Sequence, residues 1–234
     1  MKKQFLLLAL LGGTATAAQA QSAIVAGTIS LGGSIGYSSS TGKTSYSAGN
    51  TSFTDEGKRS QFSLAPTVGY FLADNLAIGL SLSYQAYSNA GSTYQTSSPG
   101  TNRAELDPAT VIQVGPYVQY YKMLSDQFGV LGTLNGGYQS TRDLEYSSDR
   151  NSAVVQETKA SGLYAGLTPG VIFFPIPKFG ISAAVGGLSY NRLNYDFPTN
   201  NGTTPSGYEE TSNDFGLTFG LDQLKFGGTY YFGR

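Results

Sequence analysis

The sequence predicts an all-β chain that closes into an eight-stranded antiparallel up-and-down transmembrane β-barrel. Three observations predict this fold. Eight segments alternate apolar residues with small or polar ones, which is the period of a two-faced strand. Short turns alternate strictly with long polar loops between these segments. Aromatic residues gather at the segment ends and flank an aliphatic middle, as the two interfaces of a bilayer favour.

The composition suits strands better than helices. The chain of 234 residues has 31 glycines, 17 tyrosines and 13 phenylalanines, and only 12% of its residues are charged. A formal net charge of -1 gives no basic stripe, so the sequence does not suggest a nucleic-acid partner. The chain has no cysteine, which excludes both a disulfide framework and a lipid-anchored lipoprotein.

The first twenty residues have the layout of a cleaved secretory signal peptide. Lys2 and Lys3 precede a short apolar core over residues 5–11, which is too short to span a bilayer. The small-x-small triplet at 18–20 predicts cleavage before Gln21. We therefore assign residues 1–20 to the signal and 21–234 to the barrel. No later apolar run is long enough for a membrane helix.

The eight predicted strands follow in order along the mature chain. Their apolar faces begin at Ile29, Phe62, Leu76, Ile112, Phe128, Leu163, Phe179 and Phe215. Short turns are expected at 73–75, 124–127 and 175–178, and long polar loops at 38–59, 88–109, 142–159 and 194–213. The apolar phase shifts near 186–187, where a bulge is expected, and again near 222–223. Nearly all charged residues fall in loops or turns, and none lies in the middle of an apolar face.

The aromatic residues form two predicted belts. One belt lies at the short-turn end and the other at the long-loop end. The short-turn belt contains Tyr70, Tyr120, Phe128, Phe173 and Phe179, and the long-loop belt contains Tyr37, Phe62, Tyr84, Tyr138, Tyr190 and Phe215. A soluble barrel or sandwich with aromatics in its core is the alternative. It would need an apolar interior, whereas the second face here is almost purely Ser, Gly, Thr and Gln.

An internal repeat of one hairpin with its loop recurs about every 50 residues. Its signature is proline, then valine, then two aromatics, at 66–71, 116–121 and 169–174. Each proline removes a backbone donor, so a bulge or unpaired position is expected near it. The stretch 66–79, PTVGYFLADNLAIG, resembles hairpins of the small "outer membrane protein β-barrel domain" family, akin to OmpX and OmpW. The resemblance implies an outer-membrane location and outer-membrane lipids as surroundings.

The last strand carries a second resemblance. Residues 225–232, KFGGTYYF, resemble the C-terminal strand of outer-membrane barrels, polar-x-Gly-x-x-aromatic-x-aromatic. In that class the strand is recognised by the barrel-insertion machinery, which the resemblance makes a partner of this chain. The residues that match the pattern are Lys225, Gly227, Tyr230 and Phe232.

The predicted lumen bears on function. Eight strands leave an interior only wide enough for side chains. Large inward residues, Gln113, Tyr117, Gln119, Tyr121 and Tyr164, are predicted to plug it. Shortening the three tyrosines together is expected to open a leak.

The sequence favours a monomeric structural or surface-interaction barrel over two other classes. Its long loops would meet extracellular ligands. The alternative is a narrow porin-like or hydrophobic-solute transport protein. An enzyme is not expected, because the histidine-based chemistries of membrane-barrel hydrolases and acyltransferases have no histidine here. No cofactor, metal or catalytic residue is predicted, and loop carboxylates such as Asp55, Glu56, Glu105, Asp107, Glu209 and Glu210 are interpreted as solvated charges.

Overall fold

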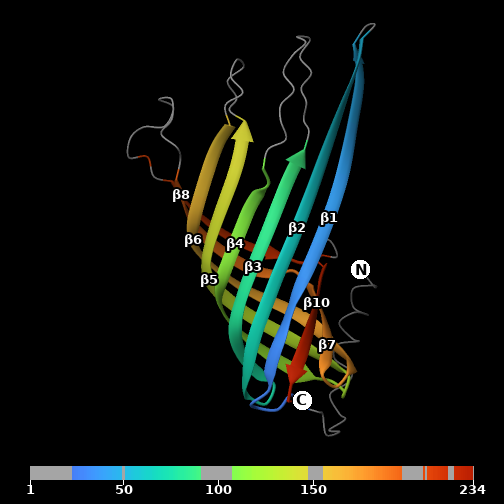
Figure 1. Ribbon diagram of the computed structural model, residues 1–234, viewed down its shortest axis with the longest axis vertical. Coiled ribbons are helices and arrows are strands. Elements are labelled where there is room, and N and C mark those ends of the chain that lie inside the picture. The colour runs from blue at the N-terminus through green and yellow to red at the C-terminus, as the bar shows by residue number, and fades with distance from the viewer. Residues whose placement is uncertain are drawn as a thin grey trace, which may run out of the picture.

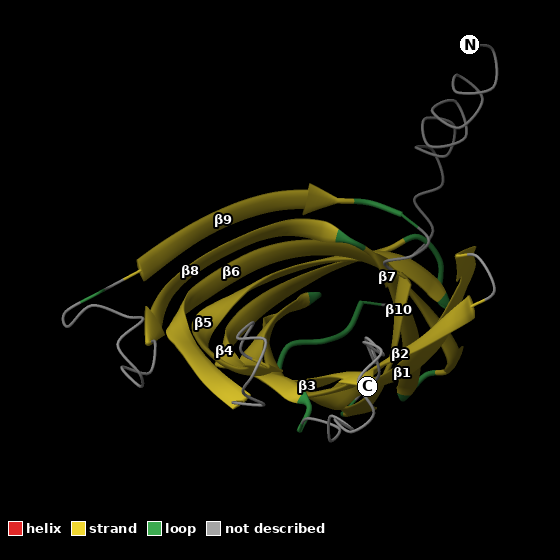
Figure 2. Cartoon of the chain, turned by 90° about the horizontal axis from the view of Figure 1, so that it is seen from above, coloured by secondary structure: helices red, strands yellow, loops and turns green. Residues whose placement is uncertain are grey.

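A single closed sheet makes up the fold. The computed structural model describes residues 23–48, 51–90, 107–146, 155–196, 208, 210–220 and 224–233. The strands are β1 (Ile29–Ala48), β2 (Thr51–Ala73), β3 (Leu76–Ala90), β4 (Ala109–Met123), β5 (Phe128–Tyr146), β6 (Val155–Ile176), β7 (Phe179–Val185), β8 (Gly187–Asp196), β9 (Glu210–Thr218) and β10 (Leu224–Phe232). Every pairing between them is antiparallel, and they wind around one lumen (Figures 1 and 2).

Ten strand segments make an eight-stranded barrel. Neighbours in sequence pair from β1 through to β6, and β1 pairs β10 to close the ring. Two of the eight barrel strands are each broken into two segments. β7 and β8 both pair β6, and they form the seventh barrel strand. β9 pairs β8 while β10 pairs β7, and these two form the eighth. The predicted fold class is confirmed.

Glycine breaks the seventh strand. Gly186 separates β7 from β8 and has φ +85°, a conformation that residues with a side chain rarely adopt. A Cβ on Gly186 would also collide with the carbonyl oxygen of Thr218. Across this position the register with β6 shifts by one residue, from Gly170↔Ala184 to Leu167↔Leu188. The phase change expected near 186–187 is confirmed.

The eighth strand also changes phase. Gly216 and Ser212 lie on the less exposed face of β9, at even positions, whereas Gly227 and Tyr231 lie on that face of β10, at odd positions. The predicted change is therefore confirmed between β9 and β10, although residues 221–223 lie outside the described part of the chain.

Several predicted loops are in fact strand, so the expected strand ends were wrong. The stretch 38–59 was expected to be a polar loop, but β1 and β2 stay paired from Ser38↔Gln61 to Ala48↔Thr51. Serine, threonine and tyrosine tolerate extended backbone well, and a ladder in water needs no apolar face. The β1–β2 hairpin consequently rises above the rest of the wall as a long ribbon (Figure 1). The loops expected at 88–109, 142–159 and 194–213 are shortened at both ends in the same way.

Each proline of the repeat interrupts the ladder on one side. Pairing of β2 with β3 skips 65–66, that of β4 with β5 skips 115–116, and that of β6 with its neighbours β8 and β7 skips 168–169. On their other sides Pro66, Pro116 and Pro169 remain in register with β1, β3 and β5. The predicted unpaired positions are confirmed. Proline has no backbone donor for a ladder, and at 168–169 the gap also lies opposite the Gly186 break in the seventh strand.

Candidate functional site: the barrel lumen

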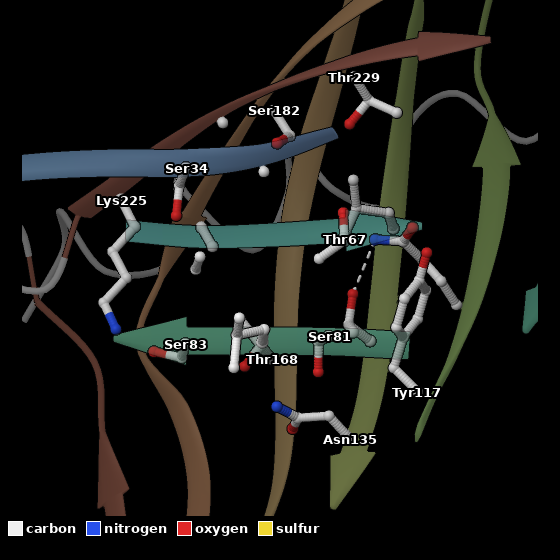
Figure 3. Close-up of a pocket in the computed structure, with 18 of the residues that line it drawn as sticks. Ser34, Thr67, Ser81, Ser83, Tyr117, Asn135, Thr168, Ser182, Lys225 and Thr229 are labelled. Atoms are coloured by element: carbon white, nitrogen blue, oxygen red, sulfur yellow. Dashed lines mark hydrogen bonds between the residues drawn. The ribbon is translucent and has the colours of Figure 1, made fainter. Parts of the chain in front are cut away.

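The upper and middle lumen is a polar cavity. Its volume is about 310 Å³. The inward positions of most strands contribute to it, because alternate residues of a strand share a face. Most of its lining side chains are hydroxyls and amides. They include Gln85 and Gln113, and Figure 3 shows Ser34, Thr67, Ser81, Ser83, Asn135, Thr168, Ser182 and Thr229. A wall of this kind holds water and polar solutes, and it cannot act as an apolar core.

Tyr117 projects from β4 across two glycines of neighbouring strands. A Cβ on Gly69 would collide with its hydroxyl oxygen, and a Cβ on Gly79 would lie 2.6 Å from its ring. The hydroxyls of Ser30 and Thr67 lie beside the Tyr117 hydroxyl. The two glycines therefore make room for the ring, which is buried inside the barrel. Tyr164 of β6 is also buried and also lines the cavity.

Amide and hydroxyl groups on either side of Tyr117 and Tyr164 form hydrogen bonds with one another. The Gln119 side-chain amide donates to Thr133 Oγ1 at 2.9 Å, and the Tyr121 hydroxyl donates to Gln119 Oε1 at 2.6 Å. Nearer the long-loop end, Gln113 Nε2 donates to Gln139 Oε1 at 2.7 Å. These large inward side chains thus satisfy one another's hydrogen-bonding groups, which removes the cost of burying those groups unpaired.

The floor of the lumen is an apolar cluster at the short-turn end. Four aromatic rings meet there, from β2, β4, β6 and β10. They are Phe71, Tyr121, Phe174 and Tyr231. Tyr231 lies 5.3 Å from Phe174, 6.1 Å from Phe71 and 6.4 Å from Tyr121, measured between ring centroids, which is the usual range for packed aromatic pairs. The Tyr121 and Tyr231 hydroxyls are hydrogen-bonded at 3.1 Å.

Aliphatic side chains fill the space around these rings. The other members of the cluster are Ile24, Ala77, Met123, Leu131 and Ile172. Most of them are at most 2% exposed, so the floor is dry and closely packed. The barrel is therefore polar and hollow in its upper part, and sealed at its short-turn end.

The segment before β1 closes the floor from below. Ile24 is fully buried in the aromatic cluster. Its backbone N–H donates to Asn75 Oδ1 and its carbonyl accepts from the Asn75 N–H, both at 2.9 Å. Further along, the Gly27 N–H donates to the Phe71 carbonyl and the Ala26 N–H to Asp74 Oδ1. The end of β2 and the β2–β3 turn thus hold residues 24–27 at the short-turn end.

The predicted plug residues are only part of what fills the lumen. Gln113, Tyr117, Gln119 and Tyr164 line the polar cavity, whereas Tyr121 lies in the dry floor. Sequence reasoning missed Phe71, Phe174, Tyr231 and Ile24. For Phe71 and Phe174 the repeat contained the signal, because its first aromatic faces outward and its second must then face inward. The exposed fraction falls from 48% at Tyr70 to 0% at Phe71 and from 56% at Tyr120 to 2% at Tyr121.

The proposed insertion strand has an outer and an inner face. Tyr230 and Phe232 are exposed on the outer surface, and their rings form an edge-on pair with centroids 4.8 Å apart. Lys225 and Gly227 line the cavity instead. The four residues of the pattern thus divide between the outer wall and the lumen. Recognition by an insertion machinery stays a prediction.

A small charged cluster lies on the outer face of β5 and β6, beyond the predicted long-loop belt. Arg142 Nε donates to Glu157 Oε1 at 2.6 Å, and Lys159 Nζ lies 3.4 Å from the same oxygen. The hydrogen bond from Arg142 lowers the pKa of the Glu157 carboxyl and raises that of the Arg142 guanidinium. Both side chains are solvent-exposed, so the pair contributes little to stability.

No group of three or more potential metal ligands occurs in the described ranges of the chain. Of the loop carboxylates, Asp107 and Glu210 fall in these ranges, Asp55 and Glu56 lie there without described side chains, and Glu105 and Glu209 lie outside. The predicted signal peptide, 1–20, also lies outside the described residues. The described part of the chain contains no helix that is long and apolar enough to cross a membrane.

The outer wall defines the class of protein. Its exposed side chains are apolar over a continuous band, including Leu31, Ile35, Val68, Leu80, Val118, Leu134, Leu167 and Ile181. Soluble monomers rarely expose a patch of this extent. Segments such as 29–37 have the length that a tilted membrane strand needs, about 9–11 residues. The chain is an eight-stranded antiparallel transmembrane β-barrel.

Comparisons with known proteins add the following. No protein-family model and no curated protein matches the sequence. Among solved structures, the chain is similar to the crystal structure of the outer membrane protein OprG from Pseudomonas aeruginosa. The sequence identity is 17% and the TM-score 0.45, over 90% of this chain and 98% of that chain.

Proposed function

We propose that this protein is an integral barrel of a bacterial outer membrane with a structural or surface-interaction role. The closed floor is the observation that carries this proposal. An aromatic cluster and the buried Ile24 seal the short-turn end, so the lumen offers no continuous water column. The parts exposed beyond the bilayer, among them the upper β1–β2 hairpin, then remain as the surface on which extracellular partners would bind.

Single-channel recording tests this role. The purified, folded protein is expected to give no stable, porin-sized conductance in planar bilayers. Large and long-lived channels in the unmutated protein would instead promote the transport alternative.

The floor itself is tested by two matched sets of variants. Replacing Tyr117 and Tyr164 with Ala enlarges the polar cavity but leaves the floor closed, so conductance should stay absent. Replacing Phe71, Tyr121 and Tyr231 with Ala removes three of the four floor rings and should open a leak. The heat-dependent shift of folded barrels on gel electrophoresis verifies that each variant is folded. A leak in the first set alone would show that Tyr117 and Tyr164, and not the floor rings, close the lumen.

One observation favours the alternative, a narrow porin-like or hydrophobic-solute transport protein. Among the described residues, β1 pairs with β10 only from Ile29 to Gly33, and β9 pairs with β8 alone. Within the described residues, no ladder therefore joins the upper part of β1 to β9. Exposed apolar side chains, Ile35, Tyr37 and Phe215, flank this place. Uptake of a hydrophobic dye into proteoliposomes without ionic conductance would support this alternative.

The outer-membrane location depends on export and insertion. We propose that the mature chain starts at Gln21 and that Tyr230 and Phe232 form the insertion signal on the lipid face. Mass spectrometry of the membrane-embedded protein should show Gln21 at its N-terminus, and an intact Met1 would contradict this. Phe232→Ser should lower the amount in the outer membrane without lowering synthesis. Unchanged outer-membrane levels would count against the signal.

A further inference from the structure

The described lining of the polar cavity carries one charge. Among the described residues that line it, Lys225 is the only ionisable one apart from tyrosines, and none is a carboxylate. Lys225 lies at the start of β10, where its pairing with Ala184 and the pairing of Gly227 with Ser182 set the inward face. Its ammonium group extends into the cavity on the side of Ser34 and Ser83 (Figure 3). It forms no ion pair with any described residue.

A single cation has a large effect in such a place. The surrounding wall is apolar on its outside and faces lipid, so the lumen is a narrow polar space in a medium of low dielectric constant. Lys225 is solvent-exposed, and walls of this kind concentrate the field of a charge that lies beside them. The described lining of the cavity therefore carries a cation and no carboxylate, and the nearby hydroxyl and amide groups offer further hydrogen bonds to an oxyanion.

The shape of the lumen limits what can bind. Because the floor is sealed, a polar ligand would enter from the long-loop end and leave the same way. The volume of about 310 Å³ lies at the lower end of small-molecule sites, which span about 300–1,000 Å³. The cavity thus suits a small polar molecule and has no room for a polymer.

We propose that this cavity is a binding site for a small oxyanion, a phosphate or carboxylate group on a compact polar molecule. Lys225 is the charge partner, and the hydroxyls of Ser34 and Ser83 are hydrogen-bond donors. The proposal goes beyond the structural role, because a barrel with a sealed floor could hold such a ligand without passing it. It is independent of the insertion signal, since the site can be studied in protein refolded without any insertion machinery.

Titration with simple anions tests the site. The full mature chain, refolded in a neutral detergent, is titrated with sodium phosphate and with sodium acetate at constant ionic strength. Backbone amide shifts of Ser34, Ser83 and Gly227 report binding by NMR. Saturable shifts are expected for at least one anion. Lys225→Gln should weaken binding at least about tenfold, as the loss of a charge-assisted hydrogen bond implies.

Matched variants separate the site from general effects of charge. Lys225→Arg keeps the cation and should retain most of the affinity. Lys178→Gln removes a lysine from the β6–β7 turn, outside the cavity lining, and should leave the affinity unchanged. Gel mobility before and after heating shows whether each variant is folded. Absence of saturable shifts with both anions, or equal affinity in folded Lys225→Gln protein, would overturn the proposal.

The source of the oxyanion is resolved by two further probes. Glycerol 3-phosphate represents a soluble phosphate ester, and an anionic lysophospholipid added to the micelles represents a lipid headgroup. Saturation of the same amides by glycerol 3-phosphate supports a soluble ligand. Saturation by the lysophospholipid alone supports a headgroup that reaches the same Lys225 site. Binding of either probe that is insensitive to Lys225→Gln would contradict the assignment.

Discussion

The two ends of the lumen differ sharply although the same strands build both. At the short-turn end, inward positions carry Phe71, Tyr121, Phe174 and Tyr231, and the interior is dry. A few residues further up the same strands, inward positions carry serine, threonine and glutamine, and the interior is a polar cavity. Outward positions are apolar along both halves. The outer wall is thus apolar at both ends, and the inward residues alone decide where the barrel is closed.

The two halves should also differ in energetics. Packing of the floor buries large apolar side chains in contact with one another, and each contributes by the area it removes from water. The hydroxyls and amides of the cavity replace hydrogen bonds to water with bonds to each other, which gains little. We therefore expect the floor to supply most of the stability that comes from the barrel interior.

The largest effect is expected from removing a floor ring. Phe174→Ala deletes a buried aromatic at the contact with Tyr231, and should cost about 3–5 kcal/mol in the free energy of unfolding. Phe173→Ala, one position earlier, changes a ring on the outer wall and should cost less. Urea unfolding in lipid vesicles measures both. Equal losses would show that the floor is not a packed core.

The next effect tests the segment that closes the floor from below. Ile24→Ala should destabilise the barrel by about 2–5 kcal/mol, because Ile24 is fully buried among the rings. Val25→Ala is the control, since Val25 is exposed. The same urea titration serves here. If the two variants behaved alike, residues 24–27 would not be part of the core.

A smaller effect is expected where the Tyr117 ring packs against Gly79 inside the lumen. Gly79→Ala places a methyl group against the Tyr117 ring and the Val68 backbone, so overpacking should cost about 1–3 kcal/mol. Gly132→Ala is matched to it, because a Cβ there meets nothing within 4 Å. Thermal unfolding monitored by circular dichroism distinguishes them. A Gly79→Ala protein as stable as the Gly132→Ala protein would contradict the close packing of the Tyr117 ring and the Val68 backbone around Gly79.

The smallest effect concerns the exposed pair outside the barrel. The Arg142 hydrogen bond lowers the pKa of Glu157 in the folded state. The pair is therefore fully stabilising above the unfolded carboxyl pKa of about 4.3, and its contribution is lost as the pH falls through the lower folded value. Glu157→Gln should abolish this part of the acid dependence. The difference between the unfolding midpoints at pH 7 and pH 3 measures this acid dependence. The control variant is Asp214→Asn.

Much of the fold could be predicted because membrane strands leave a clear pattern. The alternation from Ile29 to Tyr37 sets both faces of β1, and the shift at Gly186 reveals the break in the seventh strand. The strand ends above the membrane could not be predicted. Polar residues such as those of 38–48 are compatible with loop or ladder, and only a paired partner decides between them.

The candidate site was predictable in part. Gln113, Tyr117, Gln119 and Tyr164 are large inward residues, and the structure places all of them along the cavity. The meeting of Phe71 with Tyr231 was not predictable, because these residues are far apart in sequence and come together only when β1 closes on β10. The burial of Ile24 likewise depends on the β2–β3 turn, which supplies the Asn75 partner.

The sequence by itself determined the wall of this protein: its strands, their two faces, the apolar band and the aromatic belts. Those features follow from residues two positions apart on one strand, which is local information. The tertiary structure alone decided the floor and the charged cavity. Closure of the ring brings four separate strands to one point and turns Lys225 toward Ser34 and Ser83, and contacts across a closed barrel are not encoded in the period of any one strand.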